Sequence, residues 1–178
     1  MEQGASIFLV GLMGAGKTTV GRLLARRLAC RFVDADVEIE RRCGVKIPVI
    51  FEIEGEAGFR ARERAVIAEL SAETGIVLAT GGGAVMDPDT RADLAQRGLV
   101  LYLHAQPRDL YFRTRHDKNR PLLANAPDAL AKLTELYAAR DPLYRAVADR
   151  IIDTGPQGVQ VLMRQVLSEL PERWHHSA

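Results

Sequence analysis

The sequence predicts an α/β protein in which helices cover both faces of a parallel sheet. Short apolar runs alternate along the chain with longer segments whose apolar side chains recur at helical spacing. The first apolar run also leads through a glycine-rich turn directly into a helical pattern. Strands that alternate with helices form parallel sheets, because each parallel pair needs a crossover connection. A chain of 178 residues suits one such unit, so we expect residues 1–178 to form a single domain.

Five apolar runs are expected to supply the strands, at residues 7–10, 31–33, 76–79, 99–103 and 150–152. Helical spacing predicts helices at residues 20–28, 37–42, 56–73, 88–96, 107–115, 128–145 and 157–170. Residues 115–125 carry many charges with weak periodicity, which predicts a mobile lid. The tail from residue 171 is expected to be frayed, and its adjacent His175 and His176 are a weak metal-binding signal.

The composition excludes several classes of function. Hydrophobic residues make up 47% of the chain and charged residues 26%, as in ordinary globular proteins. A formal net charge of +1 gives no reason to expect a nucleic-acid partner or a membrane surface. Cys30 and Cys43 have no metal-ligand or disulfide spacing, and we find no signal peptide or membrane-spanning run. We therefore expect a cytoplasmic protein that works as a monomer.

The strongest signal is a glycine-rich loop between the first strand and the first helix, Gly11-Leu12-Met13-Gly14-Ala15-Gly16-Lys17-Thr18, followed by Thr19. This Walker A pattern stands where its mechanism requires it. Glycines let backbone N–H groups turn toward phosphate oxygens, and the helix directs its positive end at the same place. Lys17 would reach the β- and γ-phosphates, and the Thr18 hydroxyl would complete a Mg²⁺ shell. The alternative is a glycine-rich turn without a ligand; we favour ATP or GTP binding.

Nucleotide binding alone does not distinguish a kinase from a GTPase switch, so the surrounding motifs decide. The sequence has neither the Asp-x-x-Gly nor the Asn-Lys-x-Asp motif of such a switch. The strand at residues 76–79 runs instead into Gly81, Gly82 and Gly83. Three glycines after a buried strand indicate backbone that comes very close to a ligand, although a flexible turn is also possible.

Two carboxylates follow the second strand, in Phe32-Val33-Asp34-Ala35-Asp36. Residues two apart on a strand face the same way, so Asp34 and Asp36 can converge at the edge where α/β sheets bind ligands. One carboxylate could organise the water ligands of a metal. The other could hold an acceptor hydroxyl and take its proton. Both could instead be turn and helix-capping residues.

Three arginines complete the candidate site. Arg60 stands near the start of the helix at residues 56–73, Arg120 lies in the expected lid, and Arg140 opens an Arg-Asp-Pro-Leu-Tyr run. Guanidinium forks bind carboxylate and phosphate groups bidentately. A single arginine is more often a solvated surface residue, and 24 basic residues make coincidence easy.

Taken in order, these motifs resemble the shikimate kinase family over nearly the whole chain. One further motif, Ile-Phe-Glu-Ile-Glu-Gly-Glu, belongs to the series, whose members begin at Gly11, Phe32, Ile50, Phe59, Gly81, Arg120 and Arg140. The resemblance implies a three-layer P-loop fold like that of nucleoside-monophosphate kinases, with parallel strands in the order 2-3-1-4-5 and a lid at about residues 113–125. It also implies transfer of the γ-phosphate of ATP to the 3-hydroxyl of shikimate, in aromatic amino-acid biosynthesis.

The resemblance further implies a role for each matching residue. Contacts with ATP fall on the loop residues 14–19 and on Arg113, Arg120 and Gln157. Contacts with shikimate fall within a region at about residues 34–62 and beyond it, on Asp36, Arg60, Gly81, Gly82, Gly83 and Arg140. Catalysis would rest on Lys17, on Asp36 as the base, and on Arg120. Thr18 and, through water, Asp34 would hold Mg²⁺.

Two other interpretations stay open at this point. Another small P-loop kinase, such as a gluconate kinase, would share the loop and the fold. The paired substrate arginines and the three glycines favour a cyclic hydroxy acid over gluconate. A nucleotide-dependent binding or regulatory protein would do no chemistry, but the acidic pair and the lid arginine are both present.

Overall fold

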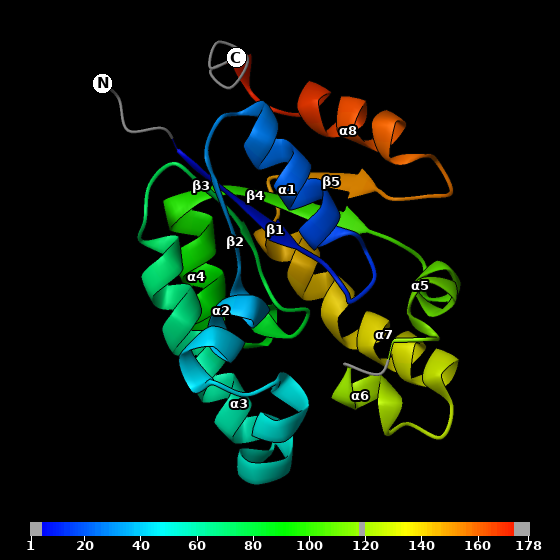
Figure 1. The fold of residues 1–178 in the computed structure, drawn as a ribbon. Helices are drawn as coiled ribbons and strands as arrows, with labels where there is room; N and C mark the ends of the chain where they lie inside the picture. Colours follow the sequence, from blue (N-terminus) through cyan, green and yellow to red (C-terminus); the bar gives the residue numbers. More distant parts are fainter. Residues whose placement is uncertain (1–4, 118–119, 173–178) are drawn as a thin grey trace.

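A computed structural model describes residues 5–117 and 120–172, and Figure 1 shows its central sheet between two layers of helices. Five parallel strands run in the order β2-β3-β1-β4-β5. Their bounds are β1 (Ser6–Val10), β2 (Arg31–Asp34), β3 (Ile76–Ala79), β4 (Gly98–His104) and β5 (Arg150–Asp153). The predicted fold class and strand order are confirmed.

The sheet is centred on β1, which pairs with β3 on one side and β4 on the other. Ile7 lies opposite Val77 and Leu99, and every residue of β1 is buried. A parallel strand covered on both faces needs apolar side chains in both directions, which is why this run is continuous instead of alternating. Burial of the central strand fixes the position of the glycine-rich loop that follows it.

The helices form the two outer layers. Figure 1 shows α1 and α8 over one face of the sheet, with α4 and α7 over the other and α3 beside α4. Their bounds are α1 (Lys17–Arg27), α2 (Ala35–Cys43), α3 (Ile47–Ser71), α4 (Pro88–Arg97), α5 (Pro107–Thr114), α6 (Pro121–Ala124), α7 (Ala129–Val147) and α8 (Val159–Ser168), with a 3₁₀ turn η1 (Ala84–Met86). None of the helices within the described ranges has the length and hydropathy that a membrane crossing requires.

The structure corrects the expected placement of the acidic pair. β2 ends at Asp34, and Asp36 stands in the first turn of α2 instead of on the strand. The Asp34 carboxylate accepts hydrogen bonds from the backbone N–H groups of Asp36 and Val37, at 3.0 and 3.3 Å. Asp34 is therefore the N-cap of α2, a role that satisfies donors left free at a helix start.

The long helix begins earlier than the sequence predicts. The expected helix at residues 56–73 is the second part of α3, which starts at Ile47 and bends at Gly55. Gly55 has φ of 71°, a left-handed conformation that favours glycine. The Arg62 guanidinium binds Glu54 bidentately across the bend, at 2.6 and 2.8 Å. The segment at residues 115–125, which was expected to be irregular, also contains a short helix, α6, and the side chain of Leu123 in this helix is buried.

Candidate active site

The glycine-rich loop closes around the start of α1. Gly11, Gly14 and Gly16 all have positive φ, at 146°, 82° and 100°. A Cβ at Gly11 would lie too close to the carbonyl of Leu103, and one at Gly14 would overlap Thr114. Backbone conformation thus favours glycine at all three positions, and close approach adds a second reason at Gly11 and Gly14. The loop leaves the N-terminal N–H groups of α1 facing an open cavity, as phosphate binding needs.

Lys17 folds back over this loop. Its Nζ donates hydrogen bonds to the carbonyls of Gly11 and Leu12, at 2.6 and 3.0 Å. Burial lowers the pKa of Lys17 to about 8, and the nearby Asp36 carboxylate opposes that shift. A buried ammonium held only by carbonyls would gain from a phosphate oxygen in the same cavity.

Thr18 and Asp34 meet at the edge of the same cavity. The Thr18 hydroxyl donates a 2.6 Å hydrogen bond to Asp34 Oδ2. A hydroxyl and a carboxylate are hard oxygen donors, and Mg²⁺ usually takes one or two such protein ligands together with phosphates and waters. The pair fits a magnesium ion, although no group of three or more acidic, His or Cys side chains suited to a metal occurs among the described residues.

A second groove continues from the phosphate cavity toward α8. Thr154, Gly155, Pro156 and Gln157 line it on one side. Arg113 spans its mouth, because its guanidinium donates to the carbonyls of Gly14, Thr154 and Gly155 at 3.2, 2.5 and 3.2 Å. Arg113 belongs to α5 and is anchored both to the glycine-rich loop and to the segment after β5. Its stacking on adenine stays a prediction, as does the nucleotide contact of Gln157.

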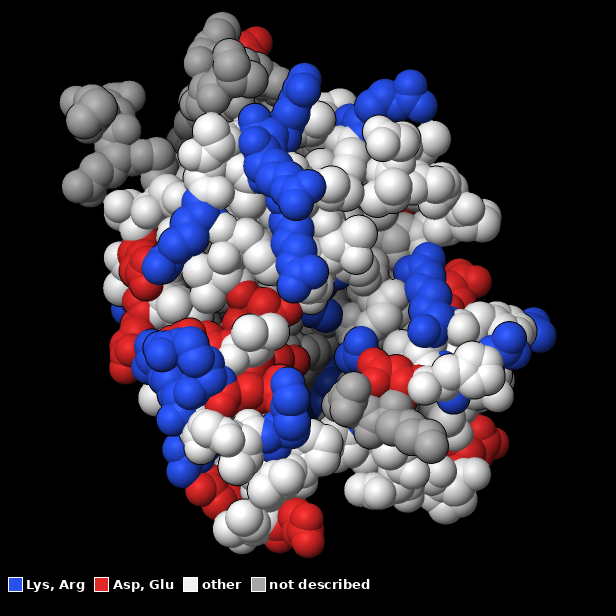
Figure 2. Space-filling model, viewed as in Figure 1, with Lys and Arg blue, Asp and Glu red and all other residues white. Residues whose placement is uncertain are grey.

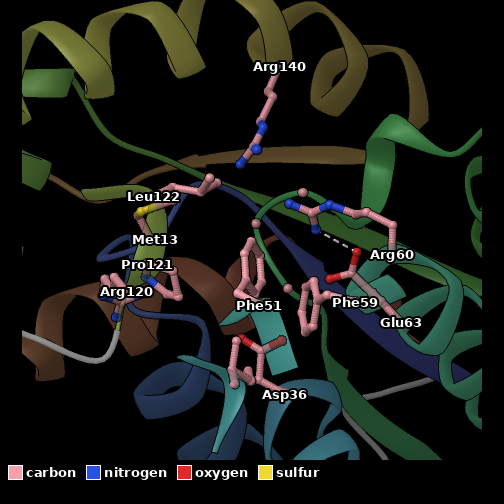
Figure 3. Close-up of a pocket in the computed structure, with 14 residues that line it drawn as sticks. Met13, Asp36, Phe51, Phe59, Arg60, Glu63, Arg120, Pro121, Leu122 and Arg140 are labelled. Carbon is pink, nitrogen blue, oxygen red and sulfur yellow. Dashed lines mark hydrogen bonds and ion pairs between the residues drawn. The ribbon is translucent and has the colours of Figure 1, made fainter. Parts of the chain in front are cut away.

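A third hollow, the acceptor pocket, adjoins the phosphate cavity and is drawn in Figure 3. Arg140 points into it from α7, Arg60 reaches it from α3, and Asp36 enters from α2. Its apolar wall includes the rings of Phe51 and Phe59, whose centroids are 4.9 Å apart. The other wall residues are Met13, Ile47, Pro121 and Leu122.

Three side chains of the acceptor pocket keep a buried polar atom that has no hydrogen-bond partner within the described part of the chain. They are Asp36 at Oδ1, Glu63 at Oε2 and Arg140 at Nη1. Buried polar groups are normally hydrogen-bonded, since leaving one unpaired costs about 1–3 kcal/mol. Two acceptors and one donor therefore await a ligand that carries hydroxyl groups and an anionic oxygen.

The two arginines differ in how they are held. Arg140 is 3% exposed. Arg60 is more open, and its guanidinium contacts Glu63 at 2.7 Å and Glu56 at 3.4 Å. Burial raises the pKa of Glu63, while the charge of Arg60 opposes that rise. Glu63 therefore orients Arg60, and the spacing of three residues on one helix face is the signal that could have revealed this pair in the sequence.

Asp36 has an electrostatic environment that suits a base. Burial raises the pKa of Asp36 to about 7, and the negative charges of Asp34 and Glu63 contribute to the rise. Lys17 and Arg120 oppose it. A carboxyl group with a pKa near neutrality can accept a proton at physiological pH and can also release it again.

The three glycines after β3 form the floor of the acceptor pocket. A Cβ at Gly81 would overlap Glu63 and stand 2.9 Å from Asp36 Oδ1, while one at Gly83 would overlap the Arg60 guanidinium. Close approach of charged side chains to the backbone is thus the reason for glycine at positions 81 and 83. The expected close approach of this backbone to a ligand stays a prediction.

Arg120 closes the junction between the hollows. Its Nε binds Asp117 at 2.8 Å, and α6 starts directly after it. The phosphate cavity and the acceptor pocket share Met13, Asp36, Gly82 and Arg120. Figure 2 shows acidic and basic side chains gathered around the hollow on this face. The two cavities thus form one cleft, with Asp36 and Arg120 among the residues that line both.

Every residue expected to contact a ligand lines one of the three connected hollows. The sequence reasoning missed Glu63 and most of the apolar wall. His175 and His176 lie outside the described residues.

A loop built to hold phosphates, joined to a pocket for a small polar acceptor, defines a P-loop kinase of small molecules. The family model for shikimate kinase matches residues 13–171 of the chain. The chain is 61% identical to a shikimate kinase of Cupriavidus pinatubonensis over 96% of its own length and 88% of that protein. It is 60% identical to one of Ralstonia nicotianae, over 93% and 87%. The chain belongs to the shikimate kinase family.

Solved structures agree with this assignment. Shikimate kinase from Acinetobacter baumannii in complex with shikimate has a TM-score of 0.90 and 49% identity, over 94% of this chain and 93% of that one. A gluconokinase from Sinorhizobium meliloti has a TM-score of 0.54 and 14% identity, over 94% and 92%. The similarity to the gluconokinase shows only that the two proteins share a fold.

Proposed function

We propose that the protein transfers the γ-phosphoryl group of ATP to the 3-hydroxyl of shikimate, and that ADP and shikimate 3-phosphate are the products. The observation that carries the proposal is the set of three unpartnered buried atoms in the acceptor pocket. Shikimate offers hydroxyl groups to two carboxylates and a carboxylate to an arginine. The related Acinetobacter enzyme, whose structure contains shikimate, supports the same substrate.

In the proposed complex, Arg140 and Arg60 bind the shikimate carboxylate, and Asp36 accepts a hydrogen bond from the hydroxyl that attacks. The bond from that oxygen to the γ-phosphorus forms as the bond from phosphorus to the bridging oxygen of ADP breaks. The hydroxyl proton passes to Asp36 and then to solvent. Lys17 and Arg120 meet the charge on the transferring group from opposite sides of the junction.

Thr18 and Asp34 are the residues that would hold Mg²⁺, Asp34 through water. The bound ion would neutralise phosphate charge. Asp34 is already fixed by its capping bonds to α2, so its second oxygen is aimed at the Thr18 hydroxyl before any ligand arrives.

We also propose that residues 113–125 act as a lid over the junction, and that closure excludes water that would otherwise accept the phosphoryl group. The residues that line the three hollows all belong to one sheet and its covering helices and loops, which supports a single domain, and we propose that this domain works as a monomer. Free cysteines at positions 30 and 43 support the cytoplasmic location.

An ADP-release assay on the purified protein tests the function. We expect turnover with ATP, Mg²⁺ and shikimate, and its loss when the metal is chelated. Gluconate in place of shikimate is the matched control, and we expect no turnover with it. Activity on gluconate and none on shikimate would contradict the proposed acceptor while leaving the kinase class intact.

A further inference from the structure

The backbone of Gly81–Gly83 has to keep one conformation, but three glycines do not restrict it. Each glycine packs against a different part of the site: Gly81 against Asp36 and Glu63, Gly82 near Arg140, and Gly83 against Arg60. Three successive glycines have more backbone freedom than any other tripeptide. Something outside the segment must therefore hold it in place when the pocket is empty.

Tyr144 supplies a contact of this kind. Its side chain is fully buried, and its hydroxyl donates a hydrogen bond to the carbonyl oxygen of Gly82. The carbonyls of Gly81 and Gly83 accept instead from N–H groups of the following 3₁₀ turn, at 3.1 and 3.0 Å. The middle carbonyl thus turns toward α7, while its two neighbours belong to the turn.

Tyr144 is itself held rigidly. Its ring packs against Tyr102 of β4, with centroids 4.9 Å apart. The Tyr102 hydroxyl donates to Asp141 at 2.7 Å, and Asp141 also binds Arg145 at 2.8 Å. Burial raises the pKa of the Tyr144 phenol, so the hydroxyl stays protonated and remains a donor.

The position of Tyr144 on α7 links two contacts of the acceptor. Arg140 precedes it by one helical turn, so both side chains leave the same face of α7. One contacts the glycine segment and the other enters the pocket. Because the peptide between Gly82 and Gly83 is planar, fixing its carbonyl also fixes the N–H on its opposite side.

We propose that Tyr144 is a positioning residue that sets the Gly81–Gly83 backbone relative to Arg140. In this way Tyr144 aligns the groups that bind the hydroxyls of the acceptor with the group that binds its carboxylate. Loss of the hydroxyl frees the Gly82 carbonyl to rotate while the ring still fills its place. The acceptor then has to order the segment when it binds. ATP binding changes little, because the glycine-rich loop after β1 holds its own backbone.

Tyr144→Phe tests the inference, and Tyr137→Phe is the matched control. Tyr137 also stands on α7 and also loses one hydrogen-bonded hydroxyl, which contacts His104 at 2.8 Å. We expect Tyr144→Phe to raise KM for shikimate about tenfold and to lower kcat severalfold, with KM for ATP within about twofold of wild type. The Tyr137→Phe protein should keep all three constants within about twofold.

A rescue variant separates positioning from a general loss of stability. Gly82 does not have positive φ, and a Cβ there would stand 3.4 Å from the Met13 nitrogen and 3.6 Å from Arg140 Nη1. Gly82→Ala can thus narrow the backbone freedom with little obstruction. We expect the Gly82→Ala/Tyr144→Phe protein to bind shikimate more tightly than Tyr144→Phe alone.

The inference rests on the proposed acceptor, and the wild-type protein separates the two failures. A wild-type protein inactive on shikimate contradicts the proposed function. An active wild type with unchanged KM in Tyr144→Phe, or equal shifts in both tyrosine variants, overturns the role of Tyr144. A double variant no better than Tyr144→Phe overturns it as well, and thermal melting of each variant identifies losses caused by unfolding alone.

Discussion

The nucleotide half and the acceptor half of the cleft are built differently. In the nucleotide half, three side chains that line the cavity already have protein partners. Lys17 donates to loop carbonyls, Thr18 donates to Asp34, and Arg113 donates to the backbone of residues 14, 154 and 155. In the acceptor half, Asp36 and Arg140 keep buried atoms that have no partner among the described residues.

This difference matches two tasks. Phosphates are bound by a preorganised backbone that needs little adjustment, so a short contiguous motif is enough. Recognition of one acceptor relies on buried groups that only the right molecule satisfies, because an analogue that lacks a hydroxyl leaves a carboxylate oxygen unpaired. The nucleotide half therefore supplies affinity for a common ligand, and the acceptor half supplies selectivity.

The largest expected effect lies in the nucleotide half. Lys17→Ala removes the ammonium that meets the transferring phosphoryl group, and kcat should fall by at least about a hundredfold. The fold should survive, because the substitution removes a buried charge and introduces none. Steady-state assays and thermal melting measure the two quantities. A Lys17→Ala protein with near-normal kcat would contradict the role of the loop.

Arg120 joins the two halves, and its replacement is expected to have the next largest effect. Arg120→Ala should lower kcat by about ten- to a hundredfold and leave shikimate affinity in the binary complex nearly intact. Arg120→Lys should recover only part of the loss, since it keeps the charge but not the planar fork. Arg115→Ala is the control, because Arg115 stacks on Phe112 and lines none of the three hollows.

Hydrogen exchange tests the lid motion independently of chemistry. Protection of residues 120–125 should increase when an ATP analogue and shikimate bind together. Equal protection in the free and bound protein would exclude a lid that closes, even if the arginine variants were inactive.

Substitutions in the acceptor half should lower the affinity for shikimate. Arg140→Ala and Arg60→Ala should each weaken shikimate binding about ten- to a hundredfold, because a charge-assisted hydrogen bond contributes about 1.5–3 kcal/mol. Arg60→Ala should also lower the melting temperature, since it leaves Glu63 buried without its 2.7 Å partner. Calorimetry with shikimate and with an ATP analogue separates the sites. Normal shikimate binding in both variants would show that the carboxylate is bound elsewhere.

The same difference explains what the sequence could predict. The phosphate loop is eight consecutive residues, so its identity and its place between strand and helix are both visible in the chain. Glu63 was missed because its importance depends on the approach of Gly81, 18 positions away in sequence and adjacent only after folding. Phe51 lies within the motif that begins at Ile50, but it was given no role of its own because it precedes the bend at Gly55, in a part of α3 that was not expected to be helical.

Asp36 lines the cleft as expected, although its expected position on the strand was wrong. The expectation placed it on β2 beside Asp34, whereas it stands on α2. Asp36 still reaches the cleft because Asp34 caps that helix and fixes the direction of its first turn. Nothing in the local sequence distinguishes these two arrangements, since both bring a carboxylate to the carboxyl end of the strand.

The acceptor half should also respond to pH. The acceptor hydroxyl loses its proton to the Asp36 carboxylate, so kcat/KM for shikimate should fall about tenfold per pH unit below a midpoint near pH 7. Stability should move the opposite way. The folded pKa of Asp36 is raised above its ordinary value of 3.8, so its contribution to stability is complete below about pH 4 and is lost as pH rises through about 7.

Asp36→Asn separates the titration of Asp36 from that of other ionisable groups, because the amide keeps the shape of the carboxyl group and carries no charge. Compared with wild type, it should be about 0.5–2 kcal/mol more stable at pH 8 and show a smaller advantage at pH 5, where only part of the Asp36 contribution has been lost. Its turnover should be low at both values. Thermal and urea unfolding at the two pH values measure the difference. An equal stability gain at pH 5 and pH 8 would mean that Asp36 does not titrate in this range, and that another group sets the pH profile.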